Sequence, residues 1–410
     1  MEIFVDIDRL WRNLGELGRI GRDPRGGVTR PSFSQADLEA RAWLKDKIES
    51  AGLAIRHDGA GNIFGRLEGS AGGKVVMAGS HIDTVPNGGM FDGAAGVLAA
   101  LECLERIREE GFRLTKTLEV ASFTDEEGGL VGDFLGSRAF IGDLDRELVE
   151  KGLTAFGLSL RDVLKATPYT VESILEARRE APEIEAFLEL HIEQGPVLDD
   201  EGVPVGIVEA IQGKHYRWCS FIGEAGHAGT TALELRRDAF LGLADFALKA
   251  TRHVAANRYG SFVTIGKVNV KPGAFSIVPG EAGFSFEFRA RTGETMAVLE
   301  RELFALAEDV AATRGLRFVS RVIDKTAPLA VPVRLTALLQ ESCARLGYPF
   351  LALTSGAGHD AQILAAKGDT AMIFVPSPDG LSHCPEESVR REDLEKGANV
   401  LLSSLIRLAS

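Results

Sequence analysis

A glycine-rich stretch directly after a short predicted strand constrains this sequence more than any other feature. The stretch Ala78–Gly96 has the sequence AGSHIDTVPNGGMFDGAAG, and it follows the run Lys74–Met77, which predicts a buried strand. Its glycines allow the backbone to fold back tightly. A strand that carries His81 and Asp83, followed by a loop that carries Asp92, can place an imidazole and a carboxylate on one small cation. The simpler alternative is a surface turn that contains one histidine.

A pair of adjacent glutamates follows the next predicted strand. This strand is expected at Thr117–Phe123, and the sequence after it is TDEEGG, in which the glutamates are Glu126 and Glu127. On a turn, both carboxylates can face one site, where one binds a metal ion and the other acts as a base. A solvent-exposed acidic turn is the alternative interpretation of this segment taken alone.

Two more histidines follow predicted strands. His191 lies in ELHIEQGP at the end of the strand Ala186–Ile192, and His383 lies in GLSHCPEE after the strand Thr370–Val375. In open α/β sheets, ligands bind at the carboxyl ends of the strands, so we expect these histidines to converge with the residues described above. Three histidines and two or three carboxylates, without cysteine, suit a pair of Zn²⁺ or similar ions about 3.5–4 Å apart.

The composition indicates a globular protein with two domains. At 410 residues, the chain is too long for one ordinary core. Its 46 basic and 59 acidic residues give a net charge of −13, which argues against nucleic acid or an anionic membrane as a partner. We expect no membrane span and no signal peptide, because the apolar runs are short and the amphipathic N-terminal segment contains acidic residues. The four scattered cysteines suggest reduced thiols and hence a cytoplasmic protein.

The order of the predicted elements divides the chain into two domains. Strands that alternate with helices predict an α/β fold for residues 1–210 and 326–410, which together form one discontinuous domain. Residues 211–325 predict an inserted β-α-β-β-α-β unit. The strands expected in this unit are 216–223, 261–270, 283–291 and 316–323, and its helices are 235–256 and 294–314. Elsewhere, helices are expected at 7–17, 34–50, 97–110, 332–346 and 390–408, and further strands at 54–57, 62–67 and 74–80.

Longer strings around these residues resemble a known enzyme family. They are GSHIDTVPNGGMFDGAAGVLA, FTDEEG, FLGSRA, ELHIEQGPVL, GEAGHAGTT, RRDA, SGAGHDA and MIFVPS followed by GLSH. The chain is similar to the di-metal amidohydrolases related to aminoacylases and zinc carboxypeptidases. Within them it resembles the branch of N-carbamoyl-L-amino-acid hydrolase, β-ureidopropionase and allantoate amidohydrolase. The resemblance implies a zinc-peptidase-like α/β catalytic domain with a mixed sheet and flanking helices, plus an inserted ferredoxin-like α+β lid and dimerisation domain.

The resemblance also implies two divalent metal ions in each subunit. His81 would bind one ion, and His191 would bind the same ion or its neighbour. Asp92 would bridge both ions, while Glu127 and His383 would complete the second site. Zn²⁺ is the expected ion, although histidine and carboxylate ligands also admit Mn²⁺, Co²⁺ or Ni²⁺.

The remaining implied roles concern proton transfer and substrate binding. Glu126 would be the general base that takes a proton from water and passes it to the leaving nitrogen, and Asp83 would hold the ring of His81. His227 would stabilise the oxyanion from the partner subunit of a homodimer, and Arg289 would bind the substrate carboxylate. The residues expected to line the substrate site are Gln194, His227, Ser276, Arg289 and His359.

The sequence departs from the family pattern at two places. The family often has asparagine thirteen residues before the arginine, where this chain has Ser276 in PGAFSIVPG, and a shorter side chain would weaken or redirect a carboxylate contact. The loop after the glutamate pair is EEGGLVGDF, which lacks the usual Arg-Phe. Both differences bear on the identity of the substrate.

The expected function is therefore metal-dependent hydrolysis of the amide or ureido C–N bond of an N-carbamoyl-L-amino acid or a close ureido compound. The substrate would be a small molecule with a carboxylate. Two alternatives within the same chemistry are an allantoate amidohydrolase and a metallo-amidase or peptidase that acts on N-acyl-amino acids or amino-acid conjugates. An alternative from another class is a non-catalytic dimeric binding protein that kept the fold.

Overall fold

The computed structural model describes residues 3–257 and 260–410 of the chain, and these divide into two compact units. The first unit contains Met1–Glu209, Val331–Leu353 and His359–Ser410, and the second contains Ala210–Ala330 and Thr354–Gly358. The second unit therefore interrupts the first in sequence, with bounds close to those expected for the inserted domain. A short returning segment, 354–358, also belongs to it, which the sequence did not indicate.

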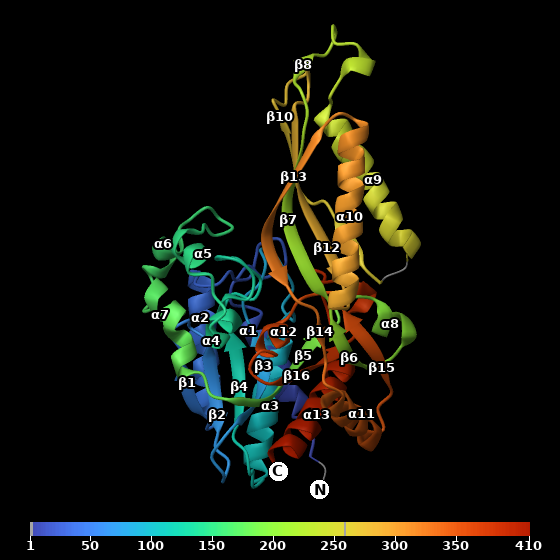
Figure 1. Ribbon diagram of the computed structural model, residues 1–410. Helices are drawn as coiled ribbons and strands as arrows, with labels where there is room; N and C mark the ends of the chain where they lie inside the picture. Colours follow the sequence, from blue (N-terminus) through green and yellow to red (C-terminus); the bar gives the residue numbers. More distant parts are fainter. Residues whose placement is uncertain (1–2, 258–259) are drawn as a thin grey trace. The chain divides into compact units, whose positions relative to one another are not determined.

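The first unit is built on a mixed sheet (Figure 1). Its successive neighbours are β1 (Ala54–His57), β2 (Ile63–Leu67), β4 (Leu118–Phe123), β3 (Val75–His81), β5 (Ile184–Ile192), β16 (Asp369–Val375) and β6 (Val205–Ile211), and β15 (Phe350–Ser355) also pairs with β6. The four central strands, β4, β3, β5 and β16, run parallel, whereas the flanking pairs are antiparallel. The carboxyl ends of these four strands therefore meet at one edge of the sheet.

Helices cover both faces of this sheet. The apolar core on one face includes residues of α1 (Ile7–Leu17), α2 (Gln35–Ser50), α3 (Ala94–Glu109), α11 (Val333–Leu346) and α13 (Arg391–Ala409). On the other face lie α4 (Leu135–Ile141) and α12 (Asp360–Leu364), where Phe140 of α4 packs against Phe64 and Phe123 of the sheet. The shorter helices are α5 (Arg146–Lys151), α6 (Leu160–Leu164), α7 (Val171–Glu176) and α8 (Val197–Glu201), and the 3-10 turns are η1 (Ala177–Glu180) and η3 (Pro378–Gly380).

Local sequence explains where two of these helices begin. Ser34 caps α2, because its hydroxyl accepts a hydrogen bond from the backbone N–H of Asp37 at 3.2 Å. Asp6 caps α1 in the same way through Arg9. The predicted helix after Gly96 starts earlier, at Ala94, because Gly93 takes a positive φ of 63° and turns the chain there.

The second unit combines a five-stranded antiparallel sheet with two helices. Its strands are β7 (Gly213–Ile222), β9 (Phe262–Thr264), β10 (Val268–Lys271), β12 (Glu281–Ala290) and β13 (Arg317–Thr326), and its helices are α9 (Ala239–Asn257) and α10 (Gly293–Thr313). Alternate residues of β12 supply the apolar face, since Phe284, Phe286 and Phe288 are buried with side chains of both helices. Further short elements are η2 (Leu233–Leu235), β14 (Leu329–Ala330) and a two-stranded ribbon of β8 (Gly226–His227) and β11 (Ile277–Val278).

Two predicted elements of this unit were wrong in extent. The single strand expected at 261–270 is two strands, β9 and β10, which both pair with β12 and are separated by a segment that contains Gly266. The helix expected from residue 235 begins at Ala239, because 233–235 form the 3-10 turn η2. Among the described helices, none is both long enough and apolar enough to cross a membrane.

Candidate metal centre

The five predicted metal ligands converge at the carboxyl edge of the four parallel strands. His81 is the last residue of β3, His191 lies at the end of β5, and Asp92 lies in the turn before α3. Glu127 follows β4, and His383 follows β16. Possible ligand atoms of these five residues form two groups, each within 4.8 Å: His81 with Asp92 and His191, and Asp92 with Glu127 and His383. Asp92 belongs to both groups, so its carboxylate lies between two candidate ion sites. A third group among the described residues joins His191 to Glu189 and His359.

The shortest contacts within the cluster involve Asp92. Its Oδ1 lies 3.1 Å from Nε2 of His191, and its Oδ2 lies 3.0 Å from Nε2 of His383. Nε2 of His383 is also 3.5 Å from Oε1 of Glu127. Atoms that bind one Zn²⁺ at about 2.0–2.2 Å are about 3–4 Å from one another, so these separations suit a shared ion.

The tautomers of two histidines show that the cluster fits a cation. Nδ1 of His81 lies 3.1 Å from the carbonyl oxygen of Asp83, and Nδ1 of His191 lies 2.9 Å from its neighbour's carbonyl oxygen, that of Ile192. A carbonyl only accepts, so each Nδ1 carries the proton and each Nε2 of the neutral ring presents a lone pair. The lone pair of His191 then faces the carboxylate of Asp92, and this contact is attractive only when a proton or a metal cation lies between them.

The burial of the carboxylates also indicates that the cluster fits a cation. Burial and the neighbouring carboxylate of Glu127 raise the pKa of Glu126 well above its ordinary value. Burial and the charge of Asp92 raise the pKa of Glu127 in the same direction. Although burial alone would lower it, the pKa of His191 is raised to about 9 by the carboxylate of Asp92. Buried acidic groups this close together are normally compensated by bound cations, and histidine with carboxylate is a donor set that divalent metals accept.

Tight turns bring these side chains to the edge of the sheet. A Cβ atom at Gly93 would lie 2.4 Å from the ring of His81, so glycine is needed where the turn passes that ring. Asp125 has a positive φ of 58° and accepts a hydrogen bond from the N–H of Leu130 at 2.9 Å. This turn presents the next residue, Glu126, whose Oε2 lies 3.6 Å from Nε2 of His81.

Asp83 contacts the cluster differently from the expectation. Its carbonyl oxygen, rather than its carboxylate, is the hydrogen-bond partner of the His81 ring, and its Oδ1 is 3.8 Å from Nδ1 of that ring. Its Oδ2 accepts a hydrogen bond from the N–H of Glu127 at 3.3 Å. Asp83 thus links the β3 loop to the turn that carries the glutamate pair.

Two predicted substrate residues of the first unit lie beside the cluster. Nε2 of Gln194 is 3.0 Å from Oδ2 of Asp92. His359, the residue before α12, is buried with its ring centroid 4.6 Å from that of His191. Sequence reasoning missed Glu189, which accepts hydrogen bonds from the Ser80 hydroxyl at 2.7 Å and the Ala361 N–H at 2.9 Å. A signal was present, because a charged residue two positions before His191 on an otherwise apolar strand points to the same face.

The other predicted substrate residues belong to the second unit. His227 is exposed at the end of the β8–β11 ribbon, and Ala228 donates its N–H to the carbonyl oxygen of Ser276 at 2.8 Å, so the ribbon brings these two segments together. Arg289 lies on β12, where its guanidinium contacts the carboxylate of Glu287 and donates to the carbonyl oxygen of Gly356.

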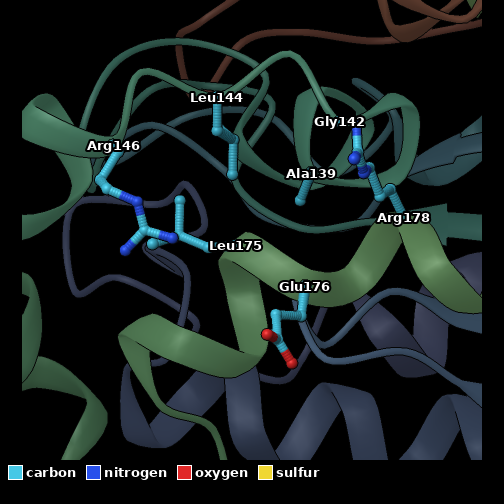
Figure 2. A pocket seen from close by; sticks show the side chains of 7 residues that line it. All are labelled: Ala139, Gly142, Leu144, Arg146, Leu175, Glu176 and Arg178. Atoms are coloured by element: carbon cyan, nitrogen blue, oxygen red, sulfur yellow. The ribbon is translucent and has the colours of Figure 1, made fainter.

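A pocket elsewhere in the first unit is separate from these residues (Figure 2). Its volume is about 210 Å³, and it lies between α4 and the segment of α7 and η1. The lining residues are Ala139, Gly142, Leu144, Arg146, Leu175, Glu176 and Arg178, and none of them is a predicted site residue. The pocket therefore takes no part in the site described here.

The first unit is an α/β fold with a mixed sheet. A cluster of histidines and carboxylates lies at the ends of its parallel strands and forms a candidate two-metal centre, a kind of site that many hydrolases use. Residues 77–407 match the model of Peptidase family M20/M25/M40, and the chain belongs to this family. It is 38% identical to an N-carbamoyl-L-amino acid amidohydrolase of Geobacillus stearothermophilus, over 99% of each chain. It is 36% identical to an allantoate amidohydrolase of Escherichia coli K12, over 96% of each chain.

A solved structure agrees with these relatives. The chain superimposes on a hydantoinase/carbamoylase family amidase of Burkholderia ambifaria with a TM-score of 0.87 and 33% identity, covering 100% of this chain and 99% of that one. The predicted family and the α/β class with a mixed sheet and flanking helices are confirmed. The predicted enzyme class, a hydrolase of non-peptide C–N bonds, is likewise confirmed by relatives named as amidohydrolases.

Proposed function

We propose that this protein hydrolyses the ureido C–N bond of N-carbamoyl-L-amino acids or close ureido compounds, using two divalent metal ions. The observation that carries the proposal is the pair of ligand groups that share Asp92. His81, Asp92 and His191 would hold one ion, and Asp92, Glu127 and His383 would hold the other. When bound, the ions supply Lewis acidity, which polarises a carbonyl oxygen and makes water acidic.

Glu126 is proposed as the general base. Glu126 is 9% exposed and its carboxylate lies 3.6 Å from the ring of His81, yet it belongs to neither ligand group. A carboxylate beside the ligands and not among them is free to take a proton from the attacking water and deliver it to the leaving nitrogen. The adjacent glutamates would therefore have different roles, Glu126 as the base and Glu127 as a metal ligand.

His227 is proposed to stabilise the negative charge that develops on the carbonyl oxygen. Its Nδ1 accepts a hydrogen bond from the N–H of Gly229 at 3.1 Å, so the proton of the neutral ring is on Nε2. An exposed Nε2–H is a donor suited to a developing oxyanion. We propose that His227 serves the site of a partner subunit, in a homodimer.

Arg289 is proposed to bind the carboxylate of the substrate. A strand fixes its backbone, and the contact with Glu287 orients its guanidinium. Nε carries a single hydrogen and is directed at Glu287, so a side-on bidentate grip through Nε requires the substrate to displace that carboxylate. Ser276, Gln194 and His359 are proposed as the other substrate contacts.

A second candidate substrate class is allantoate. The chain is similar to an allantoate amidohydrolase to nearly the same degree as to an N-carbamoyl-L-amino acid amidohydrolase, at 36% and 38% identity. Ser276 and the loop after Glu127 are the places where this chain departs from the family pattern, and both affect the fit of a substrate.

A substrate panel tests the proposal. The protein is reconstituted with Zn²⁺, Mn²⁺, Co²⁺ or Ni²⁺ in turn and given N-carbamoyl-L-amino acids, allantoate, ureidoglycolate and N-acetyl-amino acids. We expect ammonia release from N-carbamoyl substrates to have the highest kcat/KM, and D-enantiomers measure stereoselectivity. Preferential turnover of allantoate would support the second candidate. Acetate release without ammonia release would contradict both.

A further inference from the structure

Glu387 is a buried carboxylate that the mechanism above does not use. It lies four residues after His383 and is 6% exposed. Its Oε1 accepts hydrogen bonds from the backbone N–H groups of Phe91 and Asp92, both at 3.0 Å. Its Oε2 accepts a third from the hydroxyl of Ser382 at 3.0 Å. One carboxylate therefore joins two chain segments that are far apart in sequence, and each segment supplies a candidate metal ligand.

The direction of these hydrogen bonds matters for Asp92. Glu387 binds the main chain of Asp92, so the aspartate side chain is left to face His191 and His383. The hydroxyl of Ser382 lies 3.3 Å from Oδ2 of Asp92 as well. A hydroxyl has one proton, and the contact with Glu387 is the shorter of the two, so Glu387 directs that proton away from the metal-facing oxygen.

The chain makes room for this carboxylate at a specific place. A Cβ atom at Gly89 would lie 1.9 Å from Oε1 of Glu387 and 2.0 Å from its Cδ. Any other residue at this position would push the Glu387 side chain out of reach of the Phe91 and Asp92 amides. The missing side chain at Gly89 therefore leaves the space that the carboxylate of Glu387 occupies.

We propose that Glu387 is a positioning residue of the metal centre. Its carboxylate fixes the Asp92 turn relative to the His383 loop, so that Asp92, Glu127 and His383 are pre-arranged for one ion. This inference rests on the proposed two-metal function. Partners that orient metal ligands from outside the ligand set typically affect affinity by about 10–100-fold when they are removed.

The test compares metal binding by four variants with that of the wild type. Glu387→Ala removes all three hydrogen bonds, whereas Glu387→Gln keeps an oxygen for the two amides and an NH₂ group for Ser382. Ser382→Ala removes one bond. Glu386→Ala is the matched control, because Glu386 is the adjacent glutamate and is exposed. Metal-free protein is titrated with Co²⁺ and Zn²⁺ against a chelator of known affinity, and the Co²⁺ absorption spectrum reports the ligand environment.

We expect Glu387→Ala to bind its weaker ion about 10–100-fold less tightly than the wild type. Its kcat should recover as free metal is raised, with KM for substrate unchanged. The metal affinity of Glu387→Gln should fall by less than about 5-fold. The metal affinity of Ser382→Ala should lie between those of the two Glu387 variants. Should Glu387→Ala fail to fold, Ser382→Ala and Glu387→Gln still decide the question, since equal affinities in both and in Glu386→Ala would overturn the proposal.

The outcomes separate this inference from the proposed function. A wild type that binds no divalent ion would refute the proposed function. A wild type that binds two ions, together with a Glu387→Ala protein that binds them with the same affinities and the same Co²⁺ spectrum, would refute the positioning role alone.

Discussion

Asp92 is the residue on which the candidate centre depends. Its two carboxylate oxygens face two different imidazoles, at 3.1 Å and 3.0 Å, and no other residue of the described chain is shared by the His81 and His383 ligand groups. Its position follows from the main chain rather than from its own side chain, because the turn before α3 is fixed by glycine and by the amide contacts of Glu387. In the proposed centre, metal binding would therefore depend on the backbone conformation at this residue.

The proposed base gives a prediction at the same scale. Glu126→Gln should bind two metal ions with affinities close to those of the wild type, because Glu126 is outside both ligand groups. Its kcat should fall by about 10²–10⁴-fold, since an amide cannot accept the proton from water. Metal content and steady-state kinetics measure both effects, with Glu386→Gln as the control. A Glu126→Gln protein with normal kcat would reject the assignment.

Residue types predicted much of the site, but their contacts could not be predicted. Histidines and carboxylates after strand ends indicated the cluster, because the carboxyl ends of parallel strands meet at one edge. The role of the Asp83 carbonyl was not predictable, since a sequence pattern identifies side chains and not which main-chain atom a ring contacts. The role of Glu387 was not predictable, because GLSHCPEE, taken alone, is indistinguishable from an acidic surface turn.

At the scale of single elements, the turn between β3 and α3 carries the greatest constraint. Gly93 has φ +63° and ψ −51°, which L side chains rarely adopt, and it lies against the ring of His81. The sequence indicated the need for glycine in this loop. It did not indicate that one glycine packs against a proposed metal ligand, because that contact depends on the arrangement of β3 and α3.

Gly93→Ala should therefore impair both stability and metal binding. The added methyl group would lie 2.4 Å from Nε2 and Cε1 of His81, so the ring must move away from the cluster. We expect a loss of unfolding free energy of about 1–3 kcal/mol and weaker binding of the ion held by His81. Urea denaturation of the metal-free protein and metal titration measure the two effects.

Gly72→Ala is the matched control, because a Cβ atom there meets nothing within 4 Å. Equal stability and equal metal affinity in the two alanine variants would contradict the account of this turn.

Elements with a strong hydrophobic periodicity were predicted at nearly the right positions. The errors lie where the periodicity is weak. Helix α1 matches the predicted range because Leu10, Leu14 and Leu17 repeat at helical spacing and are buried. Strand β6 (Val205–Ile211) was not predicted. It is a short apolar run that pairs antiparallel with β16, and such runs are ambiguous until their partner is known.

At the scale of the whole molecule, the chain contains two compact units, each with its own core. The proposed ligands and base belong to the first unit, whereas His227, Ser276 and Arg289 belong to the second. The sequence predicted this division from the change in pattern near residue 211, but the assembly of subunits stays a prediction.

Mixing variants tests whether subunits share sites. A His227→Ala chain keeps its base, and a Glu126→Gln chain keeps its oxyanion donor, so a mixed dimer would contain one complete site. After random exchange, half of the dimers are mixed and one site in two is complete, which gives about a quarter of the wild-type activity. Each variant alone, taken through the same exchange, is the control. No rescue in a population shown to be mixed would mean that each subunit is self-contained.

The most direct measurement is the metal content of the reconstituted protein. The chain is freed of metal with a chelator, incubated with Zn²⁺, Mn²⁺, Co²⁺ or Ni²⁺, dialysed and analysed for elements, alongside an Asp92→Ala variant. The account predicts two ions per wild-type chain with at least one of these metals, and loss of both from the variant, because Asp92 belongs to both ligand groups. A wild-type chain that retains one ion or none, or an Asp92→Ala chain that still holds two, would contradict it.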